Sequence, residues 1–172
     1  MRLILLIFFL IIISQSCTIT KHVPENKSLL IGNNIVIQNE NKEDVLITKS
    51  EIFNILKQKP NKNIFGFYPF HLSIYNLSDS LNKKWLHKYL RKIGEEPIIF
   101  DRKLVEKSKV QIERLLANKG YFNSVINTSV NTNKKKSTIN FNIELGKIYK
   151  LNKINYPEIN NDEINKKIKN DK

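Results

Sequence analysis

The stretch that most constrains the fold is RLLANKGYFNSVI, which runs from Arg114 to Ile126. Its first half continues an apolar helical stripe, and Gly120 then interrupts the pattern, because glycine adopts the left-handed conformation that ends many helices. Alternating apolar and polar residues begin a few positions later, as expected of a strand with one buried face. We expect Gly120 to have a positive φ angle, so that the chain reverses and returns Tyr121 and Phe122 onto a sheet beneath the helix.

Three segments have the pattern of strands. Leu29–Gln38 is rich in Leu, Ile and Val, and the segments Val125–Asn131 and Ser137–Leu145 alternate between apolar and polar residues. The polar stretch NTNKKKS between the last two predicts a hairpin turn with the lysine run at its solvated tip. This hairpin has one apolar face, which helices must cover.

Helices are predicted between the first strand and the hairpin. Thr48 and Glu51 have the spacing of a capping box, which opens a short helix that Pro60 ends. Asp101 is placed to cap a longer helix that runs to Gly120. The order of elements, strand, helices, strand and strand, indicates an α+β fold.

The segment between the first and last of these helices is less regular. Residues 61–80 hold many aromatic side chains that need cover from water, and their pattern assigns no element. Apolar residues then recur at spacings of three and four from Leu81 to Ile93, which predicts an amphipathic helix ending at Gly94. The register of Trp85 with Tyr89 in this helix favours packing in the core.

The pattern of the first strand and helix recurs after the hairpin. Lys150–Tyr156 has the composition of a strand, and Asn160–Glu163 repeats the capping-box form. We interpret this as the start of an internal repeat that is cut off early, as in a fragment or a truncated gene product.

The N-terminus has the pattern of an export signal. Arg2 precedes an unbroken apolar run from Leu3 to Ile13, which is too short to cross a bilayer as a lone helix. Cys17, the only cysteine, directly follows Ser16 and resembles the lipobox of bacterial lipoproteins, although Ser14 stands where that box usually has leucine. We expect lipidation of Cys17 to anchor the chain to a membrane; ordinary cleavage and a retained anchor are the alternatives.

The net charge of +13 does not by itself indicate nucleic-acid binding. The lysines are scattered, only Lys134–Lys136 forms a run, and an exported protein does not ordinarily meet nucleic acid. Attraction to anionic lipid headgroups fits this charge better.

No residue pattern indicates a cofactor, a metal site or catalysis. The histidines are too dispersed for metal-ligand spacing, and the acidic residues around Pro97 are explained by turns and caps. These residues are His22, His71, His87, Glu95, Glu96 and Asp101. We expect no enzyme.

Four stretches together resemble the POTRA domains of BamA/TamA-like outer-membrane assembly proteins. ERLLANKGYFNSVI looks like the joint between the second helix and the second strand of that domain, and ELGKIYKLNKI looks like its exit into a following domain. QKPNKNIFGF and WLHKYLRKIGEEPIIFD look like a lipoprotein-type branch with an enlarged first domain. The resemblance does not extend to the C-terminal β-barrel of that family, which we expect this chain to lack.

The resemblance implies a POTRA-like β-α-α-β-β fold with a three-stranded mixed sheet, covered by helices, and an inserted helix. It divides the chain into a signal with the lipobox-like cysteine (1–17), a tether (18–27), a first domain (28–148) with an insert (61–98), and the start of a second domain (149–172).

The resemblance also implies a function. The chain would be a periplasmic protein-binding scaffold on the periplasmic face of the outer membrane, held there by a lipid anchor, whose second strand lies at the sheet edge and pairs with extended segments. The partners would be unfolded outer-membrane proteins or subunits of an assembly machine. The expected partner-binding residues are Val125, Asn127, Ser129 and Asn131. A free-standing envelope lipoprotein with a structural role is the alternative.

Overall fold

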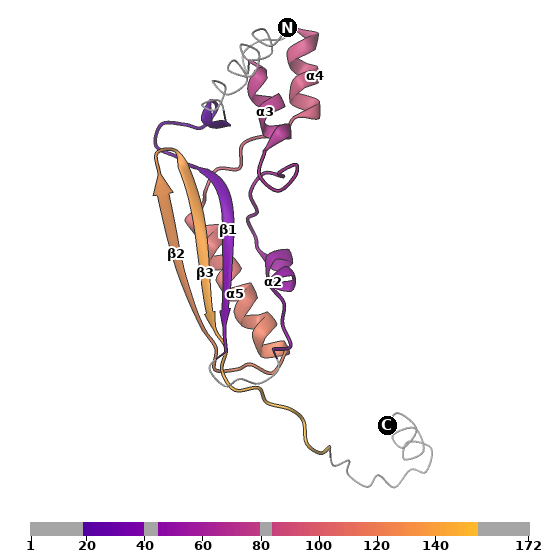
Figure 1. The fold of residues 1–172 in the computed structure, drawn as a ribbon, viewed down its shortest axis with the longest axis vertical. Helices are drawn as coiled ribbons and strands as arrows, with labels where there is room; N and C mark the ends of the chain where they lie inside the picture. The colour runs from indigo at the N-terminus through magenta and orange to yellow at the C-terminus, as the bar shows by residue number, and fades with distance from the viewer. Residues whose placement is uncertain (1–18, 40–44, 80–83, 155–172) are drawn as a thin grey trace, which may run out of the picture.

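The computed structural model describes residues 19–39, 45–79 and 84–154 (Figure 1). The elements along the chain are β1 (Leu29–Gln38), α2 (Lys49–Ile55), α3 (Phe70–Leu77), α4 (Trp85–Ile93), α5 (Arg102–Asn118), β2 (Val125–Asn133) and β3 (Lys136–Glu144). The α+β fold predicted from the sequence is confirmed. The region predicted to hold one inserted helix holds two, because the unassigned aromatic stretch contains α3.

The sheet has three strands in the order β1-β3-β2. β1 runs parallel to β3, and β2 runs antiparallel to it, so the sheet is mixed as predicted. Side chains of β3 alternate between the buried Ile139, Phe141 and Ile143 and the more exposed residues between them. This alternation gives the sheet one apolar face and one polar face.

Helices α2 and α5 cover the apolar face (Figure 1). The buried stripe of α5 is Val105, Ser108, Ile112 and Leu116. Both predicted caps are present: Thr48 and Glu51 form the capping box of α2, and the Asp101 side chain accepts a hydrogen bond from the Lys103 N–H. The polar face of the sheet carries no helix within the described residues.

The joint after α5 has the geometry predicted from the sequence. Gly120 has a φ of 92°, its N–H donates to the Ala117 carbonyl, and the Tyr121 N–H donates to the Leu116 carbonyl, which is the Schellman helix ending. Tyr121 is buried, but Phe122 is exposed, so the prediction that both aromatics return onto the sheet is wrong for Phe122. Phe122 lies in the turn that precedes β2, where its ring meets Tyr149 of the exit segment edge to face and does not reach the sheet.

An ion pair fastens the end of α5 to the start of α2. Lys119 Nζ lies 2.8 Å from Glu51 Oε1, and the Thr48 N–H donates to the other oxygen of the same carboxylate. The hydrogen bond from Lys119 and the bonds from Thr48 hold the pKa of Glu51 below its ordinary value of 4.5.

The insert differs most from its prediction. Trp85 is 76% exposed, and Phe65 and Phe67 are also exposed, so the expected core packing and cover from water are wrong. The physical reason is that α4 has α3 as its main neighbour and does not reach the sheet, which leaves its outer side uncovered.

Several predictions concern residues at the ends of the described ranges or outside them. Residues 150–154, the described part of the strand predicted from Lys150, have no regular secondary structure. Cys17 and the N-terminal signal, Leu81, and the second capping box at Asn160–Glu163 lie outside the described residues. Among the helices that the structure does describe, none has the length and apolar character needed to cross a bilayer.

Candidate protein-binding edge

Strand β2 forms one edge of the sheet, because β3 is its only neighbour in the strand order. An edge strand presents unpaired backbone N–H and C=O groups to which another extended chain can bind. The opposite edge, β1, is partly occupied: the Leu30 N–H donates to the Ile98 carbonyl and the Phe100 N–H donates to the Ser28 carbonyl, while α2 packs beside the strand. The edge of β2 is therefore the one that no other backbone segment of the described chain pairs with along its length.

The turn between β2 and β3 determines which backbone groups point outward. Asn133 pairs with Lys136, so only two residues form the turn, and Lys134 has the positive φ of 54° that such tight hairpins require at their first central position. Asn133 and Lys136 must therefore exchange backbone hydrogen bonds with each other. If they did not, the ladder would require a hydrogen bond between the two adjacent turn residues, which is impossible. Hydrogen-bonded and non-hydrogen-bonded pairs then alternate along the ladder.

This alternation assigns each residue of β2 to one side. Odd-numbered residues, from Val125 to Asn133, direct their backbone groups toward β3. The outward groups belong to the even-numbered residues Ile126, Thr128, Val130 and Thr132. No backbone hydrogen bond from elsewhere in the described chain reaches these groups.

The residues predicted to bind partners lie on this strand, but they are the odd-numbered ones, whose backbone groups point toward β3. Val125, Asn127, Ser129 and Asn131 place their side chains on the polar face of the sheet, opposite to buried Ile126, and use their backbone groups in the β3 ladder. Their side chains can flank a bound segment, but their N–H groups are not the ones that would pair with it. The sequence pattern leaves open which backbone groups of β2 point outward, because the length of the turn decides this and NTNKKKS does not mark the turn's centre.

Polar side chains cross the open face of the sheet. Asn34 Nδ2 donates to Asn140 Oδ1 at 2.9 Å, and Asn140 Nδ2 donates to Ser129 Oγ at 3.3 Å, so the contacts link all three strands. This network keeps the face hydrophilic beside the free edge. An added segment would therefore meet polar neighbours on this face.

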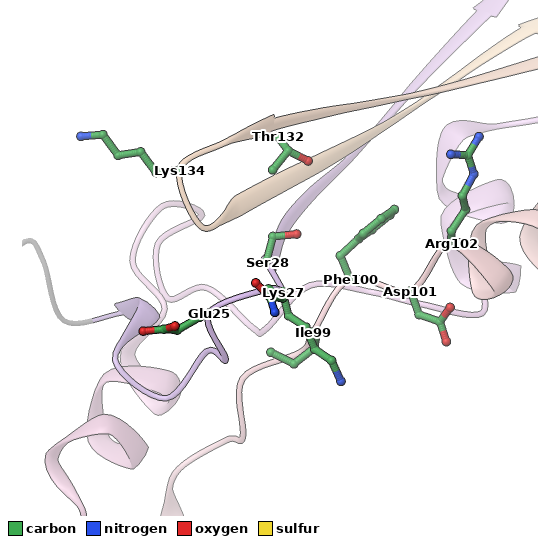
Figure 2. A pocket seen from close by; sticks show the side chains of 10 residues that line it. Glu25, Lys27, Ser28, Ile99, Phe100, Asp101, Arg102, Thr132 and Lys134 are labelled. Carbon is green, nitrogen blue, oxygen red and sulfur yellow. The ribbon is translucent and has the colours of Figure 1, made fainter.

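A cavity of about 690 Å³ lies at the turn end of the β2 edge (Figure 2). It lies between the N-terminal segment, the chain leading into α5 and the hairpin, and Ser28, Phe100 and Thr132 are among its lining residues. Charged side chains of both signs surround it, and that of Lys134 extends away from the others (Figure 2). Thr132 belongs to both the β2 edge and the lining of the cavity.

Titratable residues singled out from the sequence have structural contacts in the described chain. Within residues 19–39, 45–79 and 84–154, His, Cys, Asp and Glu form no group of three or more that could hold a metal ion. Asp101, which lines the cavity, serves as the cap of α5. His71 and His87 lie in the insert, where the His87 Nδ1 accepts a hydrogen bond from the Asp79 N–H.

Comparison with known families agrees with this architecture. A family model for POTRA, described as a surface antigen variable number repeat, matches residues 33–146, which is more than half of the chain. The matched range includes most of β1 and all of β2 and β3. No curated protein gave a significant match. The chain belongs to the POTRA family, whose domains are non-catalytic scaffolds that bind proteins in the periplasmic parts of outer-membrane assembly and secretion factors.

Proposed function

We propose that this chain is a periplasmic scaffold module of an outer-membrane protein assembly or translocation component of the BamA/TamA type. It captures extended segments of unfolded outer-membrane proteins, or of neighbouring subunits, by pairing them along β2. The observation that carries the proposal is the free edge of β2, with the outward backbone groups of Ile126, Thr128, Val130 and Thr132.

The strength of such pairing fits a transient capture step. Each outward residue offers one donor and one acceptor, and an intramolecular hydrogen bond contributes a net of about 0.5–1.5 kcal/mol. A short added strand therefore binds with modest affinity and can be released to the next partner.

The two faces beside the edge favour a particular pattern in the bound segment. On the helix-covered face the neighbours are Ile126 and Val130, and on the open face they are Asn127 and Ser129. A segment that alternates apolar and polar side chains matches both faces at once. Strands of outer-membrane barrels have this alternation, which supports unfolded barrel proteins as the client class.

The proposal includes an arrangement of the whole chain. Residues 1–17 form the export signal and lipidation site at Cys17, and 18–27 a tether whose residues 21–23 pack against the insert. Residues 28–148 form the first POTRA domain with its insert at 61–98, and 149–172 the start of a following domain. Figure 1 supports this arrangement, since the described chain begins near one end of the domain and leaves from the other. The anchor would hold the edge of β2 near the periplasmic face of the outer membrane.

Proline substitution tests the pairing. Thr128→Pro removes an outward N–H and should leave a folded domain with reduced capture, whereas the neighbouring control Ser129→Pro removes a bond to β3 and should destabilise the sheet. Circular dichroism reports folding, and crosslinking to a urea-unfolded outer-membrane barrel protein reports capture. Val130→Pro is the second variant should Thr128→Pro fail to fold. Undiminished crosslinking by a folded Thr128→Pro or Val130→Pro chain would contradict the proposal.

A further inference from the structure

Helix α4 presents an apolar line to solvent. Trp85 is 76% exposed, Tyr89 is 54% exposed and Ile93 is 40% exposed, and their spacing of four residues places them along one side of the helix. The half-buried residues of the helix, His87, Leu90 and Arg91, lie on a different side. The aromatic side of α4 is therefore its outer side, and the described chain leaves it open.

Basic residues border this line. Lys88 and Lys92 are exposed one turn apart, each next to Tyr89 or Ile93 in the sequence, and α4 contains no acidic residue. Aromatic and aliphatic side chains on one face with lysines beside them characterise helices that lie in a membrane interface. The lysines complement anionic headgroups, and their apolar stems can lie along the same surface.

The start of the described chain is fastened beside this helix pair. Lys21 Nζ donates to the Asn76 carbonyl at 3.0 Å, and His22 Nε2 lies 3.2 Å from the Ser78 carbonyl oxygen. The ring of His22 also meets Tyr75 of α3 edge to face. These contacts tie residues 21 and 22 to α3, which packs against α4.

This attachment limits how far the helices can be from the N-terminal segment. Two residue steps separate Cys17 from Ile19, and an extended chain spans at most about 7 Å over two residues. The described chain begins at the end of the domain where α3 and α4 lie (Figure 1), and the apolar run Leu3–Ile13 and Cys17 precede it in the sequence. A membrane held by either feature would be adjacent to α4.

We infer that the outer side of α4 docks on an anionic phospholipid surface, with Trp85 and Tyr89 at headgroup level and Lys88 and Lys92 on the phosphates. The nearness of the membrane rests on the proposed N-terminal attachment, whereas the affinity of α4 for anionic lipid does not. Contact at both places would restrict the orientation of the domain, and so of the β2 edge, relative to the membrane.

The chain carries its own probe, because Trp85 is its only tryptophan. The full-length chain would be mixed with phosphatidylcholine vesicles that contain phosphatidylglycerol and brominated acyl chains. We expect the fluorescence of Trp85 to shift to shorter wavelength and to be quenched by the bromine atoms. Quenching should be weaker without phosphatidylglycerol and at high salt, since salt screens exposed charges.

Two matched controls separate docking from general attraction. Moving the probe with Trp85→Phe and Phe122→Trp places tryptophan beyond the end of α5, away from α4 (Figure 1), where we expect no quenching. Lys88→Gln with Lys92→Gln should raise the lipid concentration for half-maximal quenching by about 25-fold, because each lysine near an anionic surface contributes about fivefold. Lys103→Gln with Lys107→Gln on α5 makes the same charge change and should have little effect.

Each outcome decides the inference. If the chain sediments with vesicles while Trp85 stays unquenched and open to acrylamide, the docking is wrong and the N-terminal attachment stands. If the chain does not sediment at all, the docking of α4 is wrong, and lipidation of Cys17 is decided separately by fatty-acid labelling. If Trp85 is shielded from acrylamide without vesicles, Leu3–Ile13 or a second copy covers α4, and the inference is also overturned.

Discussion

Position 120 requires glycine for two reasons, its backbone conformation and the close approach of a neighbouring segment. Its φ of 92° lies in the left-handed region, and a Cβ built there would lie 2.6 Å from the Tyr149 carbonyl oxygen. The Tyr149 N–H also donates to the Gly120 carbonyl, so the chain leaving the domain packs directly on the joint. A side chain at position 120 therefore strains both the helix ending and the exit segment.

We predict that Gly120→Ala lowers the free energy of unfolding by more than the about 1–2 kcal/mol expected for a left-handed alanine. Gly66→Ala is the control, because Gly66 also has a positive φ but a Cβ there has no neighbour within 4 Å. Denaturant unfolding followed by circular dichroism measures both. A Gly120→Ala chain as stable as the unsubstituted one would contradict the joint described above.

Glu51 gives the domain a pH dependence of known sign. Its pKa is lowered in the folded chain by Lys119 and Thr48, so the carboxylate stabilises the fold above its unfolded pKa. This stabilisation is lost as the pH falls through the lower, folded pKa. We predict that Glu51→Gln is less stable than the unsubstituted chain at neutral pH and that the difference vanishes in acid. Thermal unfolding across this range checks it, and a difference that persists unchanged in acid would refute it.

At the scale of elements, the contact between α3 and α4 depends on close approach. A Cβ built at Gly94 would lie 2.6 Å from the Tyr75 backbone nitrogen, in the middle of α3. We predict that Gly94→Ala separates the two helices and increases proteolytic cleavage within the insert, while the sheet remains folded. Limited proteolysis with mass spectrometry, alongside circular dichroism, tests this. Loss of the whole fold, or no change in cleavage, would show that the insert is not a separate packing unit.

Elements with one buried face were predictable from their periodicity. The bounds of β1, the capping box of α2 and the cap and stripe of α5 follow from local patterns that the tertiary structure reinforces. The stripe of α4 was equally clear, but periodicity shows that a helix has an apolar side and not that anything covers it. Trp85 was misplaced for this reason.

The sequence allowed us to predict which strand forms the edge, but not which residues of that strand direct their backbone groups outward. The resemblance indicated that the second strand is an edge, and the outward phase then depended on a turn in NTNKKKS that has no glycine to mark its centre. An error of one residue in a strand exchanges inward and outward groups.

At the scale of the whole molecule, the domain connects two ends with different roles in the proposal. The N-terminal segment and the insert share a small second cluster of buried residues, Val23, Leu29 and Leu72, apart from the main core. The exit segment leaves from the opposite end (Figure 1).

The proposed anchor makes a prediction at the same scale. Cys17→Ser should abolish incorporation of labelled fatty acid and release the chain from the membrane fraction to the extent that the lipid holds it. Ser16→Ala, which retains the thiol, is the control. Unchanged membrane retention together with no lipid label on the unsubstituted chain would reject lipidation at Cys17.

Amide hydrogen exchange along β2, measured by nuclear magnetic resonance, tests the central claim most directly. In the free chain we predict slow exchange at Asn127, Ser129 and Asn131 and fast exchange at Thr128 and Val130, because only the first set donates to β3. A soluble peptide copied from an alternating strand of an outer-membrane barrel should slow exchange at Thr128 and Val130. Uniform protection in the free chain, or fast exchange at both residues in the peptide-bound chain, would contradict edge pairing at β2.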